Sequence, residues 1–114
     1  MKVKINNEIM EFEGKIIEKL ETKTGTNPVT GNTWKYTRYV AQNTLPQTTT
    51  IVFDVWDGRD GRIDRLNLQV GKWYRLFLSF EAKKNKEGKW FNSISAWSAR
   101  EVSIIDENKN GEEQ

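Results

Sequence analysis

The chain has 114 residues, a length that suits one domain with a modest core. It contains no Cys and no His, which excludes disulfides, thiolate or imidazole metal sites and His-dependent catalysis. The net charge is +2. No apolar run is long enough to span a membrane, so we expect no membrane partner. Because the chain has no Cys and no His, we also expect no metal and no cofactor.

The small net charge hides an uneven distribution. Residues 106–114 carry a net charge of −3, so the rest of the chain carries about +5. Most of this excess lies in residues 59–100, which contain ten basic residues and four acidic residues. A basic body with an acidic end favours a polyanionic partner, although a solvated surface explains the same charge.

Two strands separated by a turn-rich loop are predicted in the first part of the chain. Residues 9–23 alternate as a strand does, and the alternation changes phase after Ile16. Gly14 interrupts the same run, so we expect a long strand that bends at a glycine or a bulge. Residues 24–32 are rich in Gly, Asn and Thr and predict a loop, and residues 33–42 form the second strand.

A third strand and a short helical turn follow. Residues 48–56 are rich in β-branched side chains and predict a strand whose odd positions are apolar. The glycine-containing loop after it leads into a helical turn that packs Ile63 and Leu66 against the core. We expect Asp57 or Asp60 to cap this turn.

The last two strands are joined by a basic hairpin. Residues 72–82 form the fourth strand and residues 89–104 the fifth, with the hairpin loop at 83–89. The side chains of the fourth strand expected to face inward are Tyr74, Leu76, Leu78 and Phe80. Trp90 and Trp97, on the fifth strand, are expected to brace the barrel.

Five strands with one helical turn between the third and fourth predict an all-β protein, a five-stranded OB-fold, which is a Greek-key barrel. An SH3-like barrel is the alternative. The predicted domain covers residues 8–104, preceded by an N-terminal extension at 1–7 and followed by an acidic, disordered tail at 105–114. The N-terminus lacks the apolar stretch of a signal peptide, which predicts a cytoplasmic location.

One face of the predicted barrel combines aromatic side chains with an arginine. Trp34, Tyr36 and Arg38 alternate along the second strand and therefore share a face, with Lys35 on the other. If the odd positions of the third strand point inward, Trp56 points outward beside them. These side chains predict a surface on which bases stack. Coverage of the rings by a partner subunit is the competing interpretation.

Asp54 falls on the same predicted face and is unfavourable for a phosphate ligand. We expect it to pair with Arg38 or to accept a hydrogen bond from a base. Arg38 and the lysines close to this face are candidates for phosphate contacts. The lysines are Lys35, beside the first loop together with Lys23, and Lys83, Lys84, Lys86 and Lys89 in or next to the basic hairpin.

Three segments of the chain resemble bacterial and phage single-stranded DNA-binding proteins. Residues 51–57 (IVFDVWD) resemble the third strand of that family, residues 70–76 (VGKWYRL) its fourth strand and residues 83–90 (KKNKEGKW) its basic hairpin. The chain also resembles small OB-like proteins of bacteria and phages over residues 8–103. The resemblance implies an OB-fold that binds single-stranded DNA, with Trp56 and Trp34 as binding aromatics.

Two positions depart from the family pattern. The third strand of the family begins with an aromatic on the binding face, where this chain has Thr50. The family also ends in an acidic tail that closes with a Pro-Phe pair and recruits partners. This chain ends Glu112-Glu113-Gln114, so partner recruitment does not carry over.

The sequence therefore predicts a non-enzymatic protein that binds single-stranded nucleic acid with little sequence preference. DNA is the expected ligand, RNA is the other candidate, and replication, recombination and repair are the expected settings. The alternative is a protein-interaction module that uses the aromatic face as an interface, which includes a homo-oligomer.

Overall fold

The computed structural model describes residues 4–5, 10–45, 47–58 and 60–103. Its elements in chain order are β1 (Lys4–Ile5), β2 (Met10–Thr26), β3 (Thr33–Asn43), β4 (Thr49–Trp56), α1 (Arg62–Leu66), β5 (Trp73–Lys84) and β6 (Trp90–Glu101). The five predicted strands and the helical turn are confirmed, with small shifts of their ends. The short strand β1, which pairs with the start of β2, was not predicted. The predicted tail at 105–114 lies outside the described residues.

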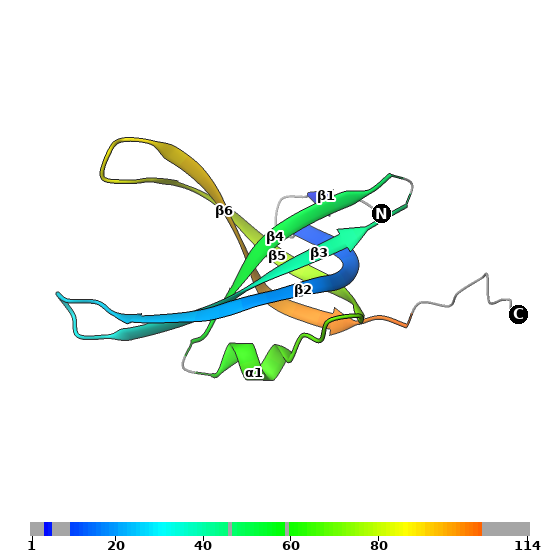
Figure 1. Cartoon of the computed structure of the whole chain (residues 1–114), viewed down its shortest axis with the longest axis horizontal. Helices are drawn as coiled ribbons and strands as arrows, with labels where there is room; N and C mark the ends of the chain where they lie inside the picture. The colour runs from blue at the N-terminus through cyan, green and yellow to red at the C-terminus, as the bar shows by residue number, and fades with distance from the viewer. Residues whose placement is uncertain (1–3, 6–9, 46, 59, 104–114) are drawn as a thin grey trace, which may run out of the picture.

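The strands close into an OB-fold barrel. Their order is β2-β3-β4-β6-β5, and β5 pairs back to β2 (Figure 1). All pairings of the barrel are antiparallel except that of β4 with β6, which is parallel. The helix α1 lies between the third and fourth strands of the barrel, as the OB-fold plan predicts. In the described part of the chain, no helix could span a membrane.

The long strand β2 closes the barrel because it pairs with two neighbours. Residues 10–15 pair with β5 and residues 15–26 pair with β3, with register shifts after Ile16 and after Lys19. A Cβ atom at Gly14 would lie 2.6 Å from the Phe12 ring and 3.0 Å from the carbonyl oxygen of Gln42. The predicted bend is therefore confirmed, and Gly14 provides the close backbone approach that it needs.

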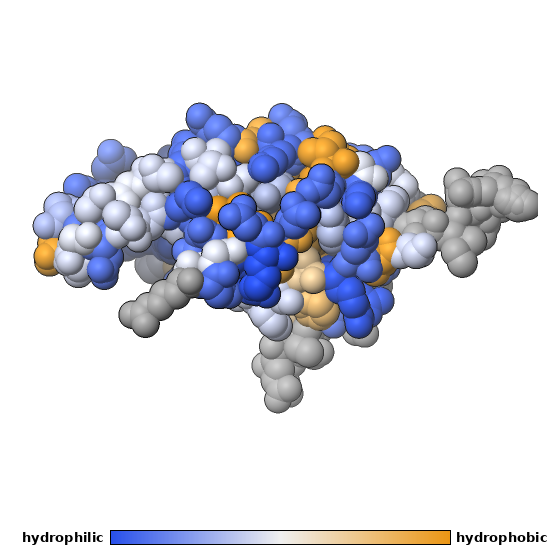
Figure 2. All heavy atoms as spheres, turned by 90° about the horizontal axis from the view of Figure 1, so that it is seen from below, coloured by the Kyte–Doolittle hydropathy of each residue, from blue (hydrophilic) through white to orange (hydrophobic). Residues whose placement is uncertain are grey.

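The barrel interior holds the hydrophobic core. Its buried apolar side chains are Phe12, Ile16, Tyr39, Ala41, Phe53, Val55, Leu68, Tyr74, Leu76, Leu78 and Ala96. Ile63 and Leu66 pack against this core, as predicted. The N-cap residue of α1 is Gly61, and the carboxylate of Asp57, from the preceding loop, accepts a hydrogen bond from the backbone N–H of Ile63 in the first turn at 2.7 Å. The surface seen in Figure 2 is mainly hydrophilic, with scattered apolar groups.

Two hairpins extend beyond the barrel as arms. One joins β2 to β3 and the other joins β5 to β6, and both project toward the same side in Figure 1. An asparagine organises each tip: the side-chain oxygen of Asn27 accepts from the N–H groups of Val29 and Thr30, and that of Asn85 from Glu87 and Lys89. The prediction that Phe80 faces inward is wrong. It is 45% exposed because β5 continues past the barrel into its arm.

Gly14→Ala tests the bend in β2. We expect it to lower the free energy of unfolding by about 1–3 kcal/mol, because the added methyl group meets a buried ring and a backbone carbonyl. Urea denaturation followed by circular dichroism measures the change. Gly58→Ala is the matched control, since its Cβ would meet only the side chain of exposed Asp60 at 3.3 Å. Equal stability of the two variants would contradict a steric role for Gly14.

Candidate functional site

Three aromatic rings form a continuous surface on the outer face of β3 and β4, which we call the aromatic platform. The ring centroids of Tyr36 and Trp56 are 4.6 Å apart, and Trp34 lies 6.1 Å from each of them. Tyr36 lies directly opposite Trp56 in the strand register. The predicted common face of these residues is confirmed. Trp34 remains 39% exposed, so the platform presents ring surface to solvent.

The position of Trp34 depends on a glycine in the neighbouring strand. Gly25 lies opposite Trp34 in the β2–β3 register, and a Cβ atom there would overlap the indole. The absence of a side chain at Gly25 therefore lets the indole lie against the backbone of β2. This contact fixes the ring on the β2–β3 arm, close to the loop that joins the two strands.

Arg38 and Asp54 continue the platform face beyond the rings. Arg38 donates from Nε to Oδ1 of Asp54 at 2.7 Å and from Nη2 to Oδ2 at 3.1 Å, which confirms the predicted pairing. These hydrogen bonds raise the pKa of Arg38 above its ordinary value, so the guanidinium stays charged. Its central carbon lies 5.7 Å from the centroid of the Tyr36 ring, which extends the stacking surface by a charged plane. Asp54 is buried and compensates that charge.

Lysines flank the platform on two sides. The ammonium of Lys83, from the β5–β6 arm, lies 6.0 Å from the centroid of the Trp56 ring and 3.8 Å from a carboxylate oxygen of Glu81. Lys23 lies opposite Tyr36 on β2, so both side chains leave the sheet on the same face. Both lysines are exposed.

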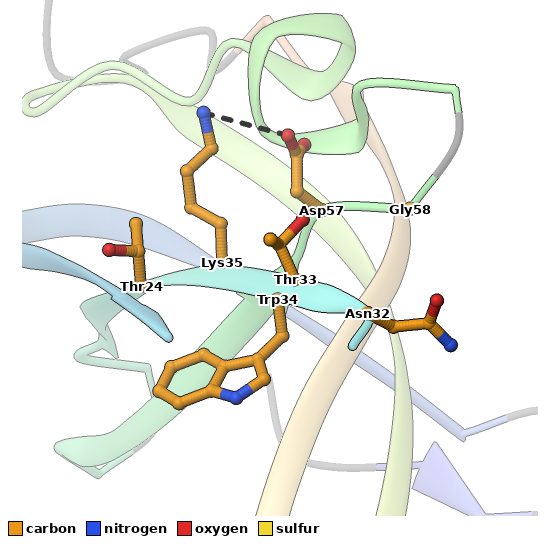
Figure 3. A pocket seen from close by; sticks show the side chains of 7 residues that line it. All are labelled: Thr24, Asn32, Thr33, Trp34, Lys35, Asp57 and Gly58. Carbon is orange, nitrogen blue, oxygen red and sulfur yellow. Dashed lines mark ion pairs between the residues drawn. The ribbon is translucent and has the colours of Figure 1, made fainter. Parts of the chain in front are cut away.

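The other predicted lysines lie farther from the rings. Lys35 leaves β3 on the face opposite Trp34 and pairs with Asp57 at 3.7 Å, beside a hollow between the loop after β4 and the start of β3 (Figure 3). The ammonium of Lys84 lies 5.7 Å from the centroid of the Trp90 ring. Lys86 and Lys89 are exposed near the tip of the β5–β6 arm.

Two further positions show how the platform ends. Thr50, where the related family has an aromatic, accepts a hydrogen bond of 3.0 Å through Oγ1 from Nε2 of Gln42, so this end of the face is polar. Phe91 was not predicted as part of the site. It lies opposite Lys83 in the β5–β6 register and is 49% exposed. The face on which Phe91 lies follows from the pairing of β5 with β6, which the sequence alone does not give.

A second aromatic group lies on β5 and β6. The rings of Phe77 and Trp97 are 5.6 Å apart, and Arg75 pairs with Glu13 at 3.5 Å on the same strand face as Phe77. Trp97 is 42% exposed, slightly more than Trp34. Trp90 is 64% exposed, so the prediction that it braces the barrel is wrong.

The model of the family described as Domain of unknown function (DUF3127) matches residues 11–100. The chain belongs to this family. No curated protein matches it. It is similar to the crystal structure of a small single-stranded DNA-binding protein from Streptomyces coelicolor, with 15% identity, a TM-score of 0.45, and coverage of 86% of this chain and 96% of that chain. It is also similar to the mitochondrial single-stranded DNA-binding protein Rim1 from S. cerevisiae, with 12% identity, a TM-score of 0.45, and coverage of 89% and 97%.

In this DUF3127 domain, Gly25→Ala tests the seating of Trp34. We expect the added methyl group to displace the indole and to weaken the near-ultraviolet circular dichroism of the stacked rings, and we expect Trp34→Ala to do the same. In a Trp34→Ala background, Gly25→Ala should change the spectrum little, because the group that it displaces is gone. Additive losses in the double variant would contradict the contact.

Proposed function

We propose that this domain binds single-stranded nucleic acid, with DNA as the preferred form and with little sequence preference. Bases stack on the aromatic platform, and lysines neutralise the phosphates. The observation that supports this most strongly is the set of three contacting rings on the outer face of β3 and β4. Stacking is tolerant of sequence because every base has a π-face.

The size of the platform suits a short strand. Each stacked base is worth about 1–3 kcal/mol, so two or three bases give about 2–9 kcal/mol. The upper end of this range reaches the roughly 8 kcal/mol of a micromolar complex. The β2–β3 arm carries part of the platform and the β5–β6 arm lies next to β4, so side chains of both arms can reach a bound strand.

The basic side chains around the platform differ in how strongly we expect them to attract phosphate. Lys23 and Lys83 flank the rings, and the lysines of the β5–β6 arm extend the positive region outward. Lys35 and Arg38 pair with the largely buried carboxylates of Asp57 and Asp54, whereas Glu81, the partner of Lys83, is exposed, so we expect Lys35 and Arg38 to add less. The mechanism needs no cofactor and no catalytic group. Such binding would serve DNA replication, recombination or repair in the cytoplasm.

Titration of oligo-dT with tryptophan fluorescence tests the stacking model. We expect the protein's fluorescence to be quenched, and Trp34→Ala and Trp56→Ala each to weaken binding by about 1–3 kcal/mol. Trp97→Ala is the matched control because Trp97 is about as exposed as Trp34 but lies outside the platform. We expect the affinity of this variant for oligo-dT to stay within about twofold of that of the unaltered protein.

A flat fluorescence and anisotropy signal at low salt would contradict the proposed function. If the protein then formed oligomers that Trp34→Ala and Trp56→Ala dissociate, the aromatic platform would be a subunit interface instead. Retained oligo-dT affinity in the Trp34→Ala, Trp56→Ala double variant would show that the ligand binds another face.

The salt dependence of binding tests the role of the lysines. The logarithm of the affinity should fall linearly with the logarithm of the salt concentration, with a slope of about −0.7 per phosphate neutralised. We expect Lys83→Gln and Lys23→Gln each to make the slope shallower by about one such step. Lys72→Gln is the control. Lys72 lies before β5, with its Nζ 3.7 Å from Oε2 of Glu101, and we expect its replacement to leave the slope unchanged. An unchanged slope for Lys83→Gln and Lys23→Gln would exclude them as phosphate contacts.

A further inference from the structure

A groove opens beside the platform where β4 and β6 separate. The two strands pair at a single position, Asp54 with Ser95, and the part of β6 that precedes Ser95 belongs to the arm. The hollow has a volume of about 420 Å³. Its walls are apolar at Val52, Phe91 and Ile94 and polar at Arg38, Asp54 and Asn92. It therefore offers flat apolar contact and a few hydrogen-bonding groups, the combination that a single base needs.

Arg38 stands in this groove with part of its hydrogen-bonding capacity unspent. A guanidinium carries five N–H donors, and the pair with Asp54 takes one from Nε and one from Nη2. Donors on Nη1 and Nη2 remain, in the fixed fork geometry of the guanidinium. Two such donors match two acceptors on one edge of guanine, O6 and N7. The buried carboxylate of Asp54 holds the guanidinium plane in place before any ligand arrives.

Phosphate is the other acceptor that an arginine fork recognises, but the surroundings favour a base. Asp54 cancels the charge of Arg38 locally, so a phosphate gains little Coulomb attraction and meets a carboxylate close by. A guanine edge is neutral and meets no such repulsion. Val52 and Phe91 are each about half exposed, at 48% and 49%, and apolar walls of this kind suit the face of a base better than a phosphate.

We propose that this groove is a guanine subsite in which Arg38, held by Asp54, donates to O6 and N7 of one base while Val52 and Phe91 contact its faces. The inference rests on the proposed function and adds a single selective position to a ligand that is otherwise held by stacking. Adenine is disfavoured, since its exocyclic amino group would place a donor against the Arg38 donors.

Oligo-dT and the same oligonucleotide with one central substitution, followed by tryptophan fluorescence, test the subsite. We expect guanine to increase the affinity about tenfold and adenine to increase it little. Hypoxanthine should retain the gain because it keeps O6 and N7. Replacing guanine by 7-deazaguanine, which lacks N7, should lose most of the gain. These comparisons use the unaltered protein, so they do not depend on the folding of a variant.

Arg38→Lys separates a base contact from a phosphate contact, because lysine keeps the charge but lacks the fork. We expect the guanine gain to fall from about tenfold to about twofold. Trp97→Ala, the control outside the groove, should retain the full gain. Equal weakening of the thymine-only and guanine-containing oligonucleotides by Arg38→Lys, with a shallower salt slope, would make Arg38 a phosphate contact and overturn the subsite.

Equal affinity of the unaltered protein for all the oligonucleotides would also overturn the subsite, while the proposed binding of single strands would stand. If none of them bound, both proposals would fail together. A gain with 7-deazaguanine as large as that with guanine would show that the preference arises from stacking and not from the Arg38 fork.

Discussion

The bidentate pair between Arg38 and Asp54 joins β3 to β4 at the register on which the surface of this domain depends. In that register Tyr36 faces Trp56, and Tyr39 faces Phe53 in the core. Because side chains alternate along a strand, a slip of one residue would turn Trp56 inward and expose the core. The same pair leaves the face almost neutral at its centre, so the attraction for a polyanion comes from lysines at its margins.

Closure of the barrel places the arms around the platform. The bulged strand β2 reaches both β5 and β3, and its far end becomes one side of the first arm. The ends of β5 and β6 form the second arm, which brings Lys83 close to Trp56 and places Phe91 opposite Lys83. Core packing inside the barrel thus fixes the positions of groups that lie wholly outside it. The aromatic platform, the lysines at its margins and the groove all take their positions from the closure of one sheet.

Much of this arrangement follows from patterns within single strands. The alternation along residues 33–42 is enough to place Trp34, Tyr36 and Arg38 on one face, and the apolar odd positions of β4 place Trp56 beside them. The exposure of Phe80 and the orientation of Phe91 could not be predicted in this way. They depend on where the barrel ends and on the register of the β5–β6 hairpin, which tertiary packing determines. The groove beside Arg38 depends on the contact of β4 with β6, which are distant in sequence.

The claim that bases stack on the platform is tested most directly by the indole N–H resonances of the five tryptophans, followed by NMR during a titration with oligo-dT. We predict that the Trp34 and Trp56 resonances shift under the ring currents of the bound bases, while those of Trp73 and Trp97 keep their positions. Shifts confined to Trp73 and Trp97, with Trp34 and Trp56 unmoved, would show that the ligand binds the opposite side of the barrel and would contradict the stacking surface assigned to β3 and β4.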